Sequence, residues 1–210
     1  DITRAIFMQG RAPYRFMKPL RMSLFLSANE DDVREAIDMG FAAGHVVGRA
    51  QPDDGDTDLR IAFDFDGVLA DDSAERVFQS EGLDGYQESE SALAEVPLSR
   101  GPMADFLEKI NRIQGIEESK RLDDPSGYRR RVHVAVVTAR SAPAHERAIN
   151  SIRQWGLRVN DAFFLGGIDK GPILEVLRPH IFFDDQRRHV EGAALSTPSV
   201  HIPFGAINRQ

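Results

Sequence analysis

Cysteine is absent from the 210-residue sequence. Its absence excludes disulfide bonds, zinc sites built from thiolates and cysteine nucleophiles, and it fits a reducing compartment such as the cytosol. Long apolar runs are also missing, and the mean hydropathy is −0.35. The sequence therefore predicts no membrane-spanning helix.

Positive charge is scarce relative to negative charge. Lysine and arginine number 26 against 33 aspartates and glutamates, for a net charge of −7. This balance argues against nucleic acid as the main partner. It leaves room for a small anionic substrate, because a bound metal ion can supply local positive charge. The six histidines show no metal-binding spacing, and we expect them on the surface or in the core.

Apolar residues make up 41% of the chain, enough for one large domain or for one domain and part of another. Predicted strands and helices alternate, which indicates an α/β fold with a parallel sheet and helices on both faces. The expected strands cover residues 5–9, 23–27, 41–47, 61–63, 132–137, 162–165, 181–183 and 200–204. A helix from Pro102, a charged loop over 116–130 and two helical stretches around Gly82 and Gly85 are also expected.

The most informative stretch is 61–72, where an apolar run leads into Asp64, Asp66 and Gly67. It reads as a buried strand that ends in two carboxylates, and ligands bind at the carboxyl ends of parallel strands. If the strand stays regular, both aspartates share one face and one divalent cation could meet both. A plain turn remains an alternative. A calcium-binding loop does not fit, because Leu69 stands where such a loop needs glycine.

Polar residues follow three further strands: Thr138, Lys170 and the pair Asp184 and Asp185. Each has an ordinary explanation, as a helix cap or a solvated lysine. Two adjacent carboxylates at a buried edge repel each other, however, unless a cation lies there. The order of these residues along the chain therefore favours one site over several unrelated caps.

An internal repeat relates the two ends of the chain. A shift of 157 positions, without gaps, superposes Ala5, Phe7, Gly10, Leu20, Arg21, Phe25 and Val33 on Ala162, Phe164, Gly167, Leu177, Arg178, Phe182 and Val190. The copies differ at polar positions, since Pro13, Ser27 and Ala28 stand where the second copy has Lys170, Asp184 and Asp185. We expect the C-terminal part of a degenerate first copy over 1–50, a linker over 51–58 and a catalytic domain over 59–210.

The order and placement of these residues resemble the haloacid-dehalogenase-type phosphohydrolases, which implies a Rossmann-like parallel sheet. By that resemblance, Asp64 is the nucleophile that forms an aspartyl-phosphate, and Asp66 is the general acid and base. Thr138, the following amide of Ala139 and Lys170 would bind the phosphate. Asp64, Asp66 through its carbonyl, and Asp185 would hold Mg²⁺, with Asp184 behind them.

Longer motifs are similar to the cytosolic 5'-nucleotidase I family, over nearly the whole chain. They lie at 63–69, 97–102, 137–147, 162–172 and 182–186, and in the stretches 1–4 and 24–34. The resemblance implies Mg²⁺-dependent hydrolysis of nucleoside 5'-monophosphates such as AMP, IMP or deoxynucleotides, in the cytoplasm. It implies a small-molecule substrate, no nucleic-acid or membrane partner and a possible homo-oligomer. The family's chain continues upstream of Asp1, and on the order of 100 further residues would complete the first copy.

In enzymes of this kind the segment at 73–98 forms a small helical cap over the site. Phe78 and Tyr86 are its aromatic residues, and either could stack on a base or pack within the cap. Arg140 could reach an anionic substrate or form a surface ion pair. Two other functions remain open: a phosphatase or phosphotransferase acting on another small phosphomonoester, and an inactive nucleotide-binding regulator.

Overall fold

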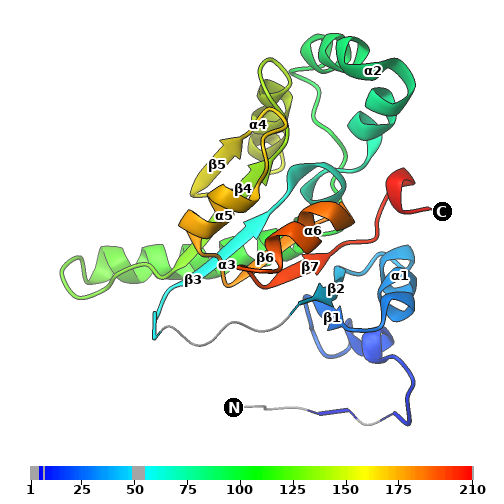
Figure 1. Cartoon of the computed structure of the whole chain (residues 1–210). Helices are drawn as coiled ribbons and strands as arrows, with labels where there is room; N and C mark the ends of the chain where they lie inside the picture. Colours follow the sequence, from blue (N-terminus) through cyan, green and yellow to red (C-terminus); the bar gives the residue numbers. More distant parts are fainter. Residues whose placement is uncertain (1–4, 7, 49–54, 210) are drawn as a thin grey trace.

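The structure is a computed structural model that describes residues 5, 6, 8–48 and 55–209. Within these residues the strands form one seven-stranded sheet in the order β1-β2-β7-β6-β3-β4-β5 (Figure 1). The strands are β1 (Phe25–Ser27), β2 (Ala43–Val47), β3 (Leu59–Phe63), β4 (Val132–Thr138), β5 (Asp161–Phe164), β6 (Ile181–Asp184) and β7 (Ser199–His201).

Helices cover both faces of this sheet. They are α1 (Glu30–Asp38), α2 (Ser73–Ala92), α3 (Ala104–Asp123), α4 (His145–Gln154), α5 (Gly171–Leu177) and α6 (Arg187–Ala193), with short turns η1 (Pro13–Phe16), η2 (Phe65–Leu69) and η3 (Ala206–Asn208). The first core cluster includes Phe63 of β3 with residues of α3 and α4, and the second includes Ala62 with residues of α5 and α6. Because neighbouring residues of a strand point to opposite faces, the two helix pairs lie on opposite sides of the sheet.

The prediction of an α/β fold with a mostly parallel sheet is confirmed, with one reversal of direction. Strands β3 to β7 run parallel to one another, whereas β2 pairs with β7 antiparallel through His45 and His201. Strand β1 then runs parallel to β2. The carboxyl ends of β3, β4, β5 and β6 therefore meet at one edge, where the sequence predicts the site.

Two predictions of local structure are wrong. The described residues of 5–9 form no strand, with residue 7 lying outside the description. The predicted loop over 116–130 begins only after Asp123, because α3 continues to that residue. Glu117 explains the longer helix: its buried carboxylate accepts hydrogen bonds from the backbone N–H groups of Arg131 (2.9 Å) and Val132 (3.2 Å). A charged residue thus holds the helix against the start of β4.

The helical cap predicted at 73–98 is built mainly of α2. It is a single element that bends at Gly82, whose φ of 72° and ψ of −167° lie outside the helical range. Figure 1 shows α2 beyond the carboxyl ends of β3 and β4, so that it stands over the edge where the site is predicted. Among the described residues, no helix combines the length and apolar character needed to cross a bilayer.

The two ends of the predicted repeat share a strand–helix–strand arrangement. Units β1–α1–β2 and β6–α6–β7 each join two parallel strands. Their registers differ by one residue, since Phe25 pairs with Ala43 while the equivalent Phe182 pairs with Ser199 and not with Val200. The predicted linker lies partly in 49–54, outside the described residues.

Candidate active site

Asp64 lies at the point where β3 ends and the chain turns sharply into η2. Its side chain is buried, and its Oδ1 accepts a hydrogen bond from the backbone N–H of Phe65 at 2.7 Å. Gly67 follows with φ of 69°, a conformation that favours glycine. A Cβ at Gly67 would lie 2.2 Å from Oδ2 of Asp185, so glycine also permits a close approach of that carboxylate. The turn thus brings the end of β6 against the end of β3.

Lys170 supplies the positive charge of the site. It precedes the first residue of α5, its side chain is only 2% exposed, and its Nζ lies 3.0 Å from Oδ1 of Asp64 and 2.7 Å from Oδ2 of Asp184. Burial alone would lower the pKa of Lys170, but the charges of Asp184 and Asp64 outweigh burial and raise it to about 12. The lysine predicted from the sequence is therefore a buried, charged bridge between two strands.

The three buried carboxyl groups differ in their environments. Burial raises the pKa of Asp64 to about 7, although Lys170 opposes the shift. Burial also raises the pKa of Asp185 well above its usual range, and the charges of Asp184 and Asp64 add to that shift. For Asp184, burial is outweighed by Lys170 and His189, which lower its pKa. Lys170 therefore neutralises part of the cluster, while burial and the neighbouring carboxylates favour the protonated form of Asp185.

Two groups of side chains could hold a metal ion here. Oxygen and nitrogen atoms of Asp64, Asp184 and His189 lie within 4.8 Å of one another. That group already contains a cation, because Lys170 contacts both carboxylates and His189 Nδ1 lies 3.2 Å from Asp184 Oδ2. Among the described residues, by contrast, the ion pairs of Lys170 involve Asp64 and Asp184 and not Asp185. The sequence predicts the metal ion on the Asp185 side of Asp64, where Lys170 makes no ion pair with the carboxylate.

The backbone around Asp185 is held by residues that the sequence analysis left without a role. His201 Nε2 lies 3.0 Å from the carbonyl oxygen of Asp185, and Asn208 Nδ2 donates to the same oxygen at 2.9 Å. His201 is buried at the end of β7, beside Asp184 in the sheet. The alternation of strands predicts that β7 ends near the site, but no sequence signal marks Asn208.

Thr138 is the last residue of β4 and is buried at the same edge of the sheet. Its carbonyl accepts from the N–H of Leu165 at 2.9 Å, and the carbonyl of Ala139 accepts from Gly167 at 3.1 Å. These bonds tie the turn after β4 to the turn that leads towards Lys170. The predicted phosphate-binding residues thus come from two loops that are fixed to each other.

Arg140 contacts the cap and Asp66. Its Nε and Nη2 donate to the two carboxylate oxygens of Asp66, both at 2.7 Å, and its Nη1 donates to Glu90 of α2. The cap aromatics Phe78 and Tyr86 contact each other edge to face, with ring centroids 6.0 Å apart. The sequence analysis missed Glu90, because a glutamate in an acidic helix carries no local signal of burial.

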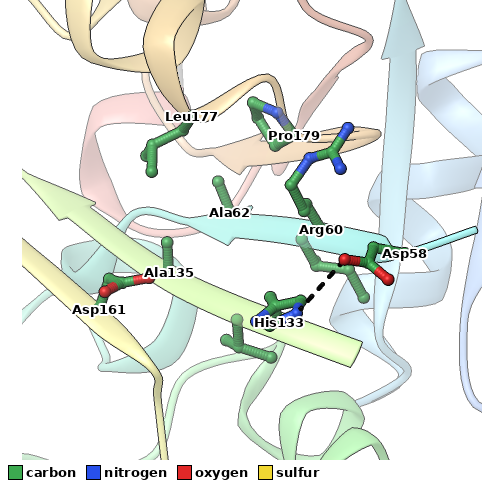
Figure 2. A pocket seen from close by; sticks show the side chains of 10 residues that line it. Asp58, Arg60, Ala62, His133, Ala135, Asp161, Leu177 and Pro179 are labelled. Atoms are coloured by element: carbon green, nitrogen blue, oxygen red, sulfur yellow. Dashed lines mark ion pairs between the residues drawn. The ribbon is translucent and has the colours of Figure 1, made fainter. Parts of the chain in front are cut away.

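A cavity of about 220 Å³ lies at the opposite end of the sheet (Figure 2). It opens near the amino ends of β3 and β4, where Asp58 and His133 form an ion pair of 3.7 Å. Ala62, Leu177 and Pro179 supply apolar lining. This cavity contains none of the residues predicted for the site, and it lacks the buried carboxylate and lysine cluster.

The sequence matches the model of the 5'-nucleotidase family over residues 1–209. The chain belongs to the 5'-nucleotidase family. It is 37% identical to human cytosolic 5'-nucleotidase 1B over 196 residues, which is 91% of this chain and 31% of that relative. This 5'-nucleotidase-family chain therefore spans about a third of the length of the curated relative it matches. No solved structure matches the chain.

Proposed function

We propose that this chain is the catalytic part of a phosphohydrolase that removes the 5'-phosphate from nucleoside monophosphates. The observation that carries the proposal is the buried contact of Lys170 with both Asp64 and Asp184, at the carboxyl edge of the sheet, in a chain of the 5'-nucleotidase family. A phosphate ester requires a nucleophile, a proton donor and nearby positive charge. The residues at this edge offer all three.

In the proposed mechanism, Asp64 attacks phosphorus and forms an aspartyl-phosphate. Its Oδ1 is already engaged by the N–H of Phe65 and by Lys170, which leaves Oδ2 as the attacking oxygen. Lys170 offsets the negative charge that the nucleophile and the phosphate bring together. Because these partners are fixed before substrate binds, little reorganisation is needed during the reaction.

Asp66 is the proposed general acid and base. As the bond between phosphorus and the ester oxygen breaks, Asp66 gives its proton to that oxygen, and the nucleoside leaves with a 5'-hydroxyl group. The resulting carboxylate then takes a proton from the water that attacks the aspartyl-phosphate, which releases inorganic phosphate and restores Asp64. The hydroxyl of Thr138 and the N–H of Ala139 are proposed to bind phosphate oxygens.

The residues fit Mg²⁺, which prefers oxygen ligands. Asp64 and Asp185 are buried carboxylates with raised pKa values, and burial is the leading cause of both shifts. We propose that these two carboxylates and the carbonyl of Asp66 hold the ion, with Asp184 behind them holding Lys170. When bound, Mg²⁺ would supply positive charge beside the transferring phosphate.

The same proposal extends to the fold and its parts. We propose that residues 59–210 form a domain of haloacid-dehalogenase type and that residues 1–50 are part of a degenerate copy of it. Residues 51–58 are the proposed linker between the two. Support comes from the two parallel strand–helix–strand units at the two ends of the sheet. The two units differ by one residue in strand register. Such a difference is expected after an old duplication, because the first copy lost its charged residues and its sequence could then change more freely.

Substrate choice is assigned to the cap over residues 73–98. Phe78 and Tyr86 are candidates to contact the base, whereas Arg140, which the sequence also offered for the anionic substrate, has its guanidinium occupied by Asp66 and Glu90. AMP, IMP and deoxynucleoside monophosphates are the proposed substrates, in the cytoplasm, by analogy with a relative that is named a cytosolic 5'-nucleotidase. A homo-oligomer is compatible with this assignment, and neither nucleic acid nor a membrane is required.

A phosphate-release assay tests the function. The purified chain is incubated with AMP, IMP, deoxynucleotides and several sugar phosphates, with Mg²⁺ and with a chelator. Release from nucleotides that depends on Mg²⁺ supports the proposal. Preferential release from sugar phosphates would instead indicate a different phosphomonoesterase, and nucleotide binding without any release would indicate an inactive regulator.

A further inference from the structure

Arg140 connects the catalytic edge of the sheet to the cap through one guanidinium group. Its side chain is 1% exposed, and it holds Asp66 with two parallel bonds of 2.7 Å. The remaining Nη1 donates to Glu90 and, at 2.9 Å, to the carbonyl oxygen of Ala144. Four of the five N–H bonds of Arg140 therefore have acceptors within the protein.

Glu90 extends the connection into α4. Its carboxylate is also 1% exposed, and it accepts from Nη1 of Arg147 at 2.7 Å as well as from Arg140. Arg147 in turn donates through Nε to the carbonyl oxygen of Val96, just after the cap helix, at 2.9 Å. The partly exposed Asp66, Arg140, the buried Glu90 and Arg147 thus alternate acidic and basic groups in a chain of contacts that runs from Asp66 to the base of the cap.

Two aromatic rings contact the Arg140 guanidinium. Its Cζ lies 5.1 Å from the ring centre of Phe65 and 5.8 Å from that of Tyr86. Phe65 belongs to the turn after Asp64, and Tyr86 belongs to α2. The planar guanidinium contacts rings from both elements and binds both oxygens of the Asp66 carboxylate, which fixes the orientation of that carboxylate. A lysine could not make this bidentate contact.

We propose that Arg140 and Glu90 position Asp66 for proton transfer to the leaving oxygen, and that they tie this orientation to the docked position of α2. The inference rests on the proposed function, because it concerns how the same acid acts. Arg140 stabilises the Asp66 carboxylate that remains after the proton has moved to the ester oxygen and the phosphorus–oxygen bond to the nucleoside has broken. Glu90 holds Arg140 in place only while α2 is docked.

The test uses two esters that differ in their need for a proton. A nucleoside 5'-alkoxide must be protonated as it leaves, whereas p-nitrophenolate leaves readily as an anion. For Arg140→Lys and Glu90→Gln in the full chain with Mg²⁺, we expect kcat on AMP to fall about 10²-fold, the usual contribution of a general acid. On p-nitrophenyl phosphate we expect a loss below about tenfold, with KM for AMP little changed.

A double-mutant comparison separates positioning from stability. In an Asp66→Asn background, Arg140→Lys should cause little further loss on AMP, because the two residues act as one unit. Arg112→Lys is the matched exposed control, since Arg112 is 73% exposed and pairs with Glu108 on the surface of α3. It should leave both activities and the melting temperature unchanged.

Three results would overturn the inference. Equal losses on both esters would show that Arg140 and Glu90 act only through stability. A rise in KM on both esters, with kcat retained, would make Arg140 a phosphate ligand. A wild-type chain that hydrolyses neither ester would contradict the proposed function itself, and with it the role of Arg140. If the wild type is active, a negative result with the variants contradicts only the positioning role of Arg140 and Glu90.

Discussion

Lys170 shows how much depends on one buried charge. It lies between Asp64 and Asp184, and all three side chains are almost completely buried. The carboxylates would repel each other without it, so Lys170 serves the fold as well as the proposed chemistry. Removing one member of a buried ion pair leaves an uncompensated charge, which costs about 3–5 kcal/mol.

Lys170→Met should therefore lower the free energy of unfolding by about 3–5 kcal/mol at pH 7. The loss should shrink as the pH falls towards 4, because the buried carboxyl groups then bind protons and no longer need a cation. Denaturant unfolding at several pH values measures this. Lys120→Met, at an exposed position of α3, is the control and should change stability little at any pH. A loss that does not vary with pH would contradict the charge argument.

Asp64 and Asp66 should respond differently to the same substitution. Asp64→Asn should abolish phosphate release from AMP, because no aspartyl-phosphate can form. Asp66→Asn should reduce kcat by about 10²- to 10⁴-fold, the range of a lost general acid, while inorganic phosphate still inhibits the residual activity. Steady-state kinetics with phosphate as inhibitor make the comparison. Mild and equal losses in both variants would rule out separate roles.

At the residue scale, the sequence predicted those side chains that follow strands. Asp64, Lys170 and Asp184 were identifiable because parallel strands deliver their ends to one edge. Glu90 and Arg147 could not be identified in this way. Glu90 binds Arg140 and Arg147, which lie 50 and 57 residues away in the sequence, and these contacts depend on how the cap docks. Arg140 was noticed for its position, but its bidentate contact with Asp66 required the structure.

At the scale of elements, α2 and α3 illustrate opposite uses of glycine. Gly82 bends α2 with a φ of 72°, whereas Gly115 lies inside the straight helix α3. A Cβ at either position would meet no atom within 4 Å, so packing does not distinguish them. Their difference lies in backbone conformation alone.

Gly115→Ala should stabilise the protein by up to about 1 kcal/mol, because alanine is the better helix former. Gly82→Ala should destabilise it by roughly 1–2 kcal/mol, or straighten the bend, because a positive φ strains any residue with a side chain. Thermal unfolding of the two variants compares them directly. If both glycines tolerate alanine equally well, the bend in α2 is not intrinsic to Gly82.

The extent of α3 shows where prediction from local sequence fails. Residues 117–123 are mostly charged, and such a run is typical of a loop. In the structure, Arg121 pairs with Glu118 at 2.7 Å along the helix, and Glu117 turns inward to hold the backbone of Arg131. The pair of Glu118 and Arg121 lies within one helical turn, but the partner of Glu117 comes from the next strand, so that contact could not be predicted from local sequence.

At the scale of the whole molecule, Glu30 joins the N-terminal unit to the rest. Its carboxylate pairs with Arg187 of α6 at 2.6 Å and with Arg34 of α1 at 2.7 Å. Arg34 also donates to the carbonyl oxygen of Asn208 at 2.7 Å. The hydrogen bond from Arg187 is the main cause that lowers the pKa of Glu30 from 4.5 to about 2.

Glu30→Gln should lower the free energy of unfolding by about 1 kcal/mol at neutral pH, a modest value because the pair is partly exposed to solvent. A carboxyl whose pKa is lowered by folding stabilises the protein above its unfolded pKa, so the difference from wild type should vanish as the pH falls from about 4.5 towards 2. Unfolding curves across this range measure it. Glu175→Gln, at an exposed position of α5, is the control. If its free energy of unfolding shows the same pH dependence, the Glu30 ion pairs are not the cause of the difference.

The sequence predicted two related strand–helix–strand units but not how they meet. The shift of 157 positions says which residues correspond, and it contains no information on the direction in which two units pair. Pairing of β2 with β7 involves residues far apart in the chain, Val46 with Val200 for example. Only the assembled sheet reveals that the pairing is antiparallel.

This single reversal sorts the loops of the molecule into two groups. Loops that follow β3, β4, β5 and β6 open on the edge that carries Asp64 and Lys170, while those that follow β1 and β2 open on the other edge. We therefore expect insertions after β2 to affect the proposed site less than insertions after β3, β4, β5 or β6. The turn at 40–42, which enters β2, borders the catalytic edge and should tolerate much less change in length.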